Sequence, residues 1–377
     1  MNFDLTDEQR MLADTVGRYV EKNCDFARWR RSVASDAGIS EAHWRAFAEM
    51  GLLGLNIPES HGGIGAGPLE TLLVAEAFGR AMVVEPFVSS AVVAAALLRR
   101  HGSEGQREAV LPGIADGSRR LALVALERDG RYDLQHVATT LRQGADGLRI
   151  DGLKSVVLDA PSADTLIVSA RECGDVGSLA GIRLLLVDAK APGVSMTSYR
   201  TIDGRRCADV RFDSVRVKAD DAIAGDGYRA LDEVVDHGIA ALCAEAVGAM
   251  AALLDITVAY LKTRRQFGQP IGSFQALQHR AVEMLSALEQ SRSMAYVAAA
   301  GVDQADPVER RKAVSAAKAV VGRYARFIGE NAVQLHGGIG MTDELAVGHY
   351  FKRLSSIDMT WGNVEHHVER YGACMQP

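Results

Sequence analysis

Three shortages in this sequence narrow its possible functions. The five cysteines form no CxxC pair and no histidines stand at ligand spacing, so we expect no metal site and no disulfide framework, but a reduced, cytoplasmic protein. The net charge of −6 excludes nucleic acid and anionic membranes as expected partners. The longest apolar run, Ala91 to Leu98, is far short of the roughly 20 residues that span a bilayer. The acidic start at Asp4 is also unlike a signal peptide.

What the sequence contains is enough apolar material for large cores. Of its 377 residues 48% are hydrophobic and 24% charged, which is typical of two or three globular domains. Helical periodicity dominates both ends, and short β-rich segments fill the middle. We therefore expect an α+β protein with an N-terminal helical domain at 1–118, a middle β domain at 119–224 and a C-terminal four-helix bundle at 225–377.

Local signals place individual elements. Thr6 with Gln9 predicts a capping box, Ser40 predicts a second helix start, and Pro307 predicts a first-turn proline. A last helix is expected from Thr342 to Arg370. The predicted strands are Leu121–Glu127, His136–Arg142, Leu148–Leu158, Asp164–Ala170, Ile182–Val187 and Ala208–Val217.

Two tracts carry candidate chemistry, Tyr260–Gln278 and Gln334–Gly340. At the turn in the first tract, the guanidinium of Arg264 suits a diphosphate group, although Arg-Arg at a helix end also fits a solvated surface. In the second tract, the pair Gly337-Gly338 lets backbone N–H groups approach a ligand, although a lone Gly-Gly is equally a helix stop. Neither tract decides the function by itself.

In combination the tracts resemble the acyl-CoA dehydrogenase family. Tyr260, Arg264, Phe267-Gly268, Ile271, Phe274-Gln275, Gln334 and Gly337 to Gly340 stand in that family's order and spacing. The resemblance continues at Leu5 to Gln9, at Pro58 to Gly63, and at Asp151-Gly152 with Lys154, so it covers nearly the whole chain. Within that family the pattern resembles the small subunit of pimeloyl-CoA dehydrogenase and related proteins.

The resemblance implies an FAD enzyme that acts on an acyl-CoA and passes electrons to an electron-transfer flavoprotein. It implies a homotetramer, or an α2β2 heterotetramer with a larger subunit, in which each FAD lies between two subunits. The residues offered to a neighbour's FAD would be Arg264, Phe267, Gln275, Gln334, Gly337 and Gly338, and Asn363 and Glu365 occupy positions that line the flavin.

The chain departs from the family at the flavin ring and at the catalytic base. Relatives place hydroxyl and amide groups where this chain has Leu126 and Tyr132, and a Trp and a Thr where it has Val156 and Leu158. The positions at which the family keeps its proton-abstracting Glu fall at Trp361 and near Gly238. Neither residue can accept a proton.

Glu245 is the one remaining candidate base, because it is the only charge between Asp236 and Asp255 on an apolar helix. It is either a buried functional carboxylate or an exposed residue of a tight helical face. Asp236 is expected to cap the start of that helix. His366 and His367 are expected to be structural, because sequence neighbours on a helix face different ways.

Two hypotheses follow. The chain is either a competent acyl-CoA dehydrogenase with a displaced base, or a non-catalytic partner whose bundle completes the FAD site of a larger subunit. The sequence favours the second, because the residues that serve a neighbour are present while base, Trp and Thr are absent together. A flavin oxidase or monooxygenase on the same fold stays open.

Overall fold

The computed structural model describes residues 4–144 and 147–375, which form two compact units. The bundle unit comprises Met1–Arg31, Pro68–Val83 and Ile239–Pro377, and the sheet unit comprises Ser32–Gly67 and Val84–Gly238. The chain is therefore grouped differently from the three consecutive domains expected from sequence, because the N-terminal segment contributes to both units.

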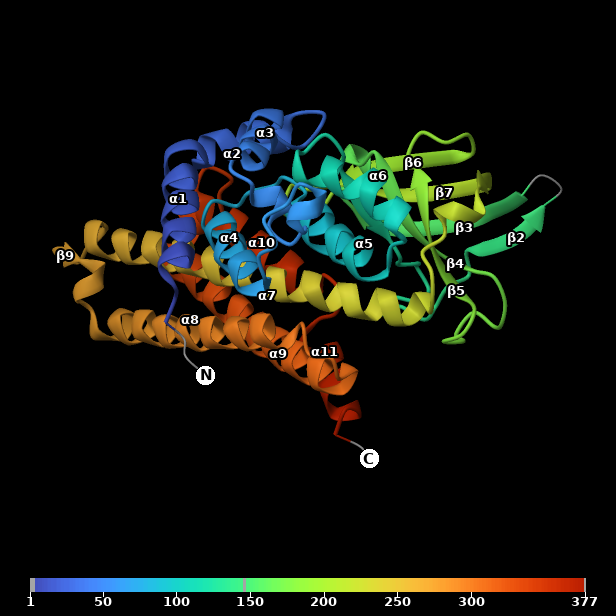
Figure 1. Cartoon of the computed structure of the whole chain (residues 1–377). Coiled ribbons are helices and arrows are strands. Elements are labelled where there is room, and N and C mark those ends of the chain that lie inside the picture. The colour runs from blue at the N-terminus through green and yellow to red at the C-terminus, as the bar shows by residue number, and fades with distance from the viewer. Residues whose placement is uncertain (1–3, 145–146, 376–377) are drawn as a thin grey trace. The chain divides into compact units, whose positions relative to one another are not determined.

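Long helices make up the bundle unit. Helices α8 and α9 run side by side (Figure 1), and α10 and α11 both pack on α9. The helix bounds are α1 (Asp7–Asn23), α2 (Phe26–Ala34), α4 (Pro68–Arg80), α7 (Gly227–Thr263), α8 (Gln275–Gly301), α9 (Pro307–His336), α10 (Ala346–Met359) and α11 (Val364–Ala373), of which α2 and α7 continue into the sheet unit.

The predicted helix starts are confirmed by their hydrogen bonds. The Thr6 hydroxyl accepts from the Gln9 N–H at 3.2 Å, and the Gln9 side chain accepts from the Thr6 N–H at 2.9 Å, which completes the capping box. Pro307 opens α9 behind an Asp306 cap. In the sheet unit, Ser40 caps α3 (Glu41–Glu49) by accepting from the His43 N–H.

Two glycines let α4 and α7 touch backbone to backbone within the bundle unit. A Cβ added to Gly79 would lie 1.9 Å from the Glu245 carbonyl oxygen, and one added to Gly248 would lie 1.8 Å from that of Glu76. No side chain fits at either position, so this helix crossing requires glycine on both partners.

Helix α7 is unusually apolar for its 37 residues. By length and composition it could span a membrane, but 89% of its apolar 18-residue segment is buried inside the protein. That burial is typical of a core helix.

The sheet unit is built on a seven-stranded sheet in the order β1-β4-β2-β3-β7-β6, with β5 also paired to β4. All neighbouring pairs are antiparallel except β1 with β4 and β2 with β4. The strands are β1 (Leu121–Val124), β2 (Thr140–Gly144), β3 (Gly147–Leu158), β4 (Thr165–Arg171), β5 (Ile182–Asp188), β6 (Val194–Arg200) and β7 (Arg206–Val217). The predicted strands are present with shifted ends, and β6 was missed.

Helical segments of the same unit precede the sheet in the chain. Besides α3 they are the π-helical segment Phe87–Ala94, α5 (Ala95–His101) and α6 (Glu104–Ala115). Alternate residues of the strands form one core, in which Ile150, Val168 and Val210 are fully buried.

Two sequence expectations about helices are wrong. The helix expected over Thr342–Arg370 is broken at Thr360–Asn363, because Trp361 and Gly362 adopt positive φ values of 54° and 114° and Asn363 then caps α11 by accepting from the His366 N–H. Asp236 does not cap α7, which begins at Gly227 and places Asp236 in its interior, fully buried.

Candidate flavin and acyl site

The two tracts that carried the sequence argument meet in the bundle unit. The Tyr260 ring stacks on the His336 ring with centroids 4.4 Å apart, and its hydroxyl donates to the His336 carbonyl at 3.4 Å. Tyr260 lies near the end of α7 and His336 ends α9. This stack therefore brings the turn after α7 beside the glycines after α9, as the sequence spacing alone could not show.

The turn after α7 is a tight hairpin of β8 (Arg265–Gln266) and β9 (Gln269–Pro270). Its two central residues, Phe267 and Gly268, both have positive φ, 52° and 82°, as a two-residue hairpin with a primed turn requires. The Phe267 ring is 90% exposed and meets Phe274 edge-on at 6.1 Å. A rigid turn that holds an aromatic ring in solvent suits contact with a ligand or another chain.

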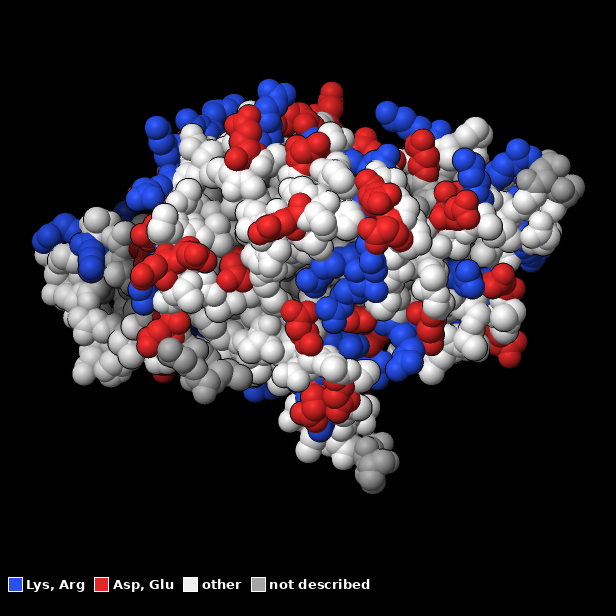
Figure 2. Space-filling model, in the orientation of Figure 1, with Lys and Arg blue, Asp and Glu red and all other residues white. Residues whose placement is uncertain are grey.

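Polar groups suited to a diphosphate lie beside this hairpin, at the start of α8 and at the end of α9. Arg264, Gln275 and Gln334 are exposed. A Cβ added to Gly337 or Gly338 would meet no atom within 4 Å, so the space above both glycines is open to a ligand. Basic side chains gather at the β9 end in Figure 2, where Arg264 and Arg265 are exposed. An arginine, amide side chains and unobstructed glycine backbone fit the diphosphate of FAD.

Asn363 and Glu365 lie far from that group. The Asn363 amide donates to the Glu365 carboxylate at 2.6 Å at the start of α11. That end of α11 follows a turn whose carbonyls are bound by Lys318, and Lys318 precedes His336 by 18 residues on α9. At a rise of 1.5 Å per residue the separation is roughly 27 Å. The structure therefore brings together six of the eight predicted cofactor residues and leaves two at the other end of the bundle.

Glu245 lies in the core of the bundle unit. It is 3% exposed, and its Oε1 accepts from Arg353 Nε of α10 at 2.7 Å. Its backbone carbonyl is the atom against which Gly79 packs. A carboxylate in a buried ion pair between α7 and α10 is already neutralised by its partner, so this geometry favours a structural role over the catalytic role suggested by sequence.

In the sheet unit, the strand face expected to meet a flavin is apolar. Val156 is 51% exposed and holds φ at 53°, a strained value for a β-branched residue. Its N–H donates to Asp209 Oδ1 at 3.1 Å, and the Tyr199 hydroxyl donates to the same oxygen at 2.8 Å. Leu126 and Leu158 are half-buried. None of Leu126, Val156 and Leu158 has a hydroxyl, so this half fits a flavin less well than the bundle half.

The same strand, β3, also contributes Lys154 to a buried ion pair whose role the sequence did not predict. Lys154 is fully buried, and its ammonium lies 2.8 Å from Glu127 and donates to the Ser169 hydroxyl at 2.8 Å. Burial lowers the pKa of Lys154 to about 8, with Glu127 acting in the opposite direction. Burial acts to raise the pKa of Glu127, but Lys154 and the Thr139 and Ala138 amides hold it below its usual value. The pair fixes the segment after β1 to β3.

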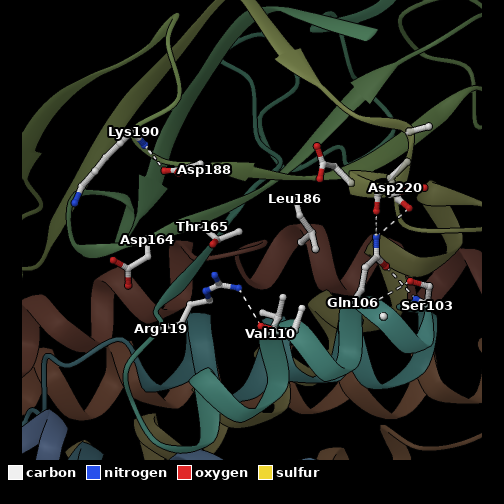
Figure 3. Close-up of a pocket in the computed structure, with 15 residues that line it drawn as sticks. Ser103, Gln106, Val110, Arg119, Asp164, Thr165, Leu186, Asp188, Lys190 and Asp220 are labelled. Atoms are coloured by element: carbon white, nitrogen blue, oxygen red, sulfur yellow. Dashed lines mark hydrogen bonds between the residues drawn. The ribbon is translucent and has the colours of Figure 1, made fainter. Parts of the chain in front are cut away.

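A separate pocket of about 770 Å³ lies in the sheet unit between α6 and the ends of β4 and β5 (Figure 3). None of the predicted site residues lines it. Its polar groups include pairs that are already made, since Gln106 Nε2 donates to the Asp220 carbonyl at 2.8 Å and Asp188 accepts from the Lys190 N–H at 2.8 Å. The pocket therefore does not belong to the candidate flavin site.

The fold is that of an FAD-dependent flavoprotein. Family models match in three parts, for the N-terminal domain of acyl-CoA dehydrogenase at residues 6–118, the middle domain at 122–215 and the C-terminal domain at 225–375. The chain belongs to the acyl-CoA dehydrogenase family, whose members are FAD-dependent oxidoreductases.

Individual relatives agree with this assignment. The probable acyl-CoA dehydrogenase YngJ of Bacillus subtilis (strain 168) is 29% identical over 97% of each chain. A variant of the Tcur3481-Tcur3483 steroid ACAD is 31% identical, with a TM-score of 0.88 over 98% of each chain. The FAD complex of PigA is 25% identical, with a TM-score of 0.89 over 99% of this chain and 98% of that one.

Proposed function

We propose that this chain is the partner subunit of an acyl-CoA dehydrogenase assembly that desaturates an acyl-CoA thioester between its α and β carbons. In this proposal Arg264, Phe267, Gln275, Gln334, Gly337 and Gly338 bind an FAD whose ring lies against the middle domain of another, larger subunit. Bound FAD supplies the hydride acceptor of the reaction. The larger subunit supplies the base.

The observation that carries the proposal is the contrast between the two halves of the site. The group around the β8–β9 hairpin is assembled, exposed and open above Gly337 and Gly338. The chain's own flavin face offers Leu126, Val156 and Leu158. A subunit that kept its own flavin and base would need both halves.

The state of the carboxylates supports the same division. A base that removes an α-proton must reach substrate and change protonation during turnover. Glu245 is committed to Arg353, and the family's usual base position holds Trp361. The bundle half is therefore the part of the site to which this chain contributes.

The assembly we propose is an α2β2 heterotetramer, and a homotetramer is the alternative. The Tcur3481-Tcur3483 enzyme, whose name joins two components, is a relative that supports a mixed assembly. The resemblance to the small subunit of pimeloyl-CoA dehydrogenase points the same way. We further propose a cytoplasmic location and an electron-transfer flavoprotein as electron acceptor.

Two other functions stay in competition. In the first, the chain is itself a competent dehydrogenase in which Glu245 exchanges Arg353 for substrate. In the second, the same fold serves a flavin oxidase or monooxygenase, as fold does not fix the reaction. The visible spectrum of the purified chain, alone and after co-expression with a larger acyl-CoA dehydrogenase subunit, separates these cases. A solo chain with one FAD that reduces an electron acceptor with an acyl-CoA refutes the partner role.

Arg264→Ala tests the binding group directly. Loss of a charge-assisted contact to a phosphate is worth about 1.5–3 kcal/mol, so we expect FAD retention during gel filtration of the assembly to fall at least tenfold. Arg326→Ala is the matched control, because Arg326 is an exposed arginine of α9 paired with Glu330. Equal FAD content in both variants contradicts the assignment of Arg264.

A further inference from the structure

The pocket between α6 and the ends of β4 and β5 contains positive charges that the protein itself leaves unpaired (Figure 3). The half-buried Arg119 guanidinium makes one hydrogen bond, from Nη1 to the Ala109 carbonyl at 3.3 Å, and no ion pair within the described part of the chain. The exposed Lys190 ammonium has no partner among the same residues. A half-buried guanidinium without a counter-charge suits an anionic group of a ligand, above all a carboxylate.

Negative charge lies at the other end of the pocket, on the far side of Leu186 from Arg119 in Figure 3. The Asp220 carboxylate has no partner among the described residues, since Gln106 binds only the backbone carbonyl of Asp220. In all, four aspartates line the pocket against one arginine and one lysine. An occupant that brings a carboxylate to Arg119 must therefore also bring positive charge to the Asp220 end.

An open strand edge runs between the two charged ends. On the side of β5 away from β4, the Ile223 N–H donates to the Leu184 carbonyl at 2.8 Å, and apart from this bridge the described residues provide no partner strand there. Backbone groups two residues apart in a strand point the same way, so the Leu186 carbonyl and the Asp188 N–H also face this side. Both residues line the pocket. Unpaired edge groups of this kind are a template for an added strand.

We propose that this pocket binds the C-terminal tail of a partner protein as an extra parallel strand on β5. One residue of such a tail would donate to the Leu186 carbonyl and accept from the Asp188 N–H. A parallel strand runs toward Asp188, which brings its terminal carboxylate to Arg119 and Lys190. A lysine or arginine about three residues before the carboxylate would reach Asp220.

The dimensions of the pocket fit this occupant. Leu185 pairs with Ala222, the residue after Asp221, and Asp188 lies three residues beyond Leu185 along β5. At about 3.3 Å per residue the two charged ends are roughly 10 Å apart, which three extended residues span. The volume of about 770 Å³ is also within the range of roughly 300–1,000 Å³ that is usual for ligand pockets.

The acidic end of the pocket is open to a longer chain. Ser103 and Gly105 line that end and are exposed, and a Cβ added to Gly105 would meet no atom within 4 Å. The residues that precede a bound tail can therefore continue into solvent. This opening favours the tail of a protein over a free peptide of three residues.

Isothermal titration calorimetry of the full chain tests the charges. The probe is N-acetyl-Lys-Ala-Val-Ala with a free carboxylate. Its C-terminal amide should bind about tenfold more weakly, and the version with norleucine for lysine about two- to fivefold more weakly. No binding of the probe at about 1 mM, or equal affinity for acid and amide, overturns the proposal. Tighter binding of unacetylated Ala-Val-Ala would assign the pocket to free peptides and overturn the assignment to a protein tail.

Variants of the chain test the same contacts. Arg119→Met should bind the probe about tenfold more weakly and should no longer distinguish acid from amide. Asp220→Asn should no longer distinguish lysine from norleucine, and as a change at an exposed side chain without contacts it also covers the case in which Arg119→Met does not fold. Arg142→Met is the matched control, because Arg142 is an exposed arginine of β2 outside the pocket. Equal affinities in Arg119→Met and Arg142→Met refute the proposal.

Backbone pairing has its own test. Methylation of the valine nitrogen in the probe removes the donor to the Leu186 carbonyl, so binding should be lost. The unmethylated probe should slow hydrogen exchange at the Asp188 amide, measured on the segment 182–190. Binding that survives methylation, or unchanged exchange at Asp188, overturns the added strand. None of these residues belongs to the candidate flavin site, so the proposed function is tested separately.

Discussion

Glu245 offers the sharpest test, because its two possible roles predict opposite results for Glu245→Gln. The carboxylate is buried and lies 2.7 Å from Arg353 Nε, which is itself only 6% exposed. Removing one member of such a pair leaves a buried charge without its counter-charge, which costs about 3–5 kcal/mol. In a folding unit of about 150–250 residues each kcal/mol lowers Tm by about 2–4 °C. We therefore expect Glu245→Gln to lower Tm by roughly 6–20 °C.

The partner substitutions separate pairing from charge. Arg353→Met should cost a similar amount, because it strands the carboxylate instead of the guanidinium. Glu245→Met with Arg353→Met replaces both by apolar groups of similar size and should regain most of the loss, as apolar replacements of buried ion pairs are often neutral. A double-mutant cycle then gives the coupling between the two side chains.

The assay is thermal unfolding with turnover of the assembly measured on the same samples. Folded Glu245→Gln should retain most of its activity below its Tm, because the ion pair of Glu245 with Arg353 holds α7 to α10. A variant with unchanged Tm and turnover reduced a hundredfold or more would falsify this reasoning and make Glu245 the base.

Two further predictions concern stability. Gly79→Ala should destabilise the bundle unit by about 2–3 kcal/mol or prevent its folding, because its Cβ would lie 1.9 Å from the Glu245 carbonyl oxygen. The control is Gly17→Ala, which should be neutral or stabilising because a Cβ at Gly17 meets nothing within 4 Å. Equal denaturation midpoints for the two variants would contradict the helix crossing. The hydrogen bond from His101, with the ion pair to Arg100, lowers the pKa of Glu233 to about 2 from 4.5, so this contribution to stability is complete above pH 4.5 and lost as pH falls toward 2. Glu233→Gln should flatten the unfolding free energy over that range, and an unchanged acid profile would refute the pairing.

The elements best predicted from sequence are those whose signals are local. The Thr6 capping box, the Ser40 cap and the Pro307 start depend on residues within one turn, and the structure confirms each. The break at Trp361 was missed because Trp has no local preference for positive φ. Contacts from α9 and α11, distant in sequence, impose that conformation.

The same distinction holds for the site. The sequence was enough to find the tracts that contain Arg264 and Gln334. It was also enough to see that the family's two positions for the catalytic Glu hold Trp361 and Gly238, since residue identities and spacings can be read without a structure. It could not show that the Tyr260–His336 stack joins the tracts, nor that Asn363 and Glu365 lie at the far end of the bundle.

By itself the sequence indicated the family through the resemblance of its two tracts. It also determined the order of helical and β-rich segments and the chemistry available at each position, because these follow from residue identity and short-range periodicity. Tertiary structure alone decided that Glu245 is paired with Arg353, that Lys318 binds the carbonyls of Asp358, Thr360 and Gly362, and that the N-terminal segment is divided between two units. The physical reason is that burial and pairing depend on partners distant in sequence, which no local pattern specifies. Glu245 and Arg353 are 108 residues apart, and Lys318 and Asp358 are 40 residues apart.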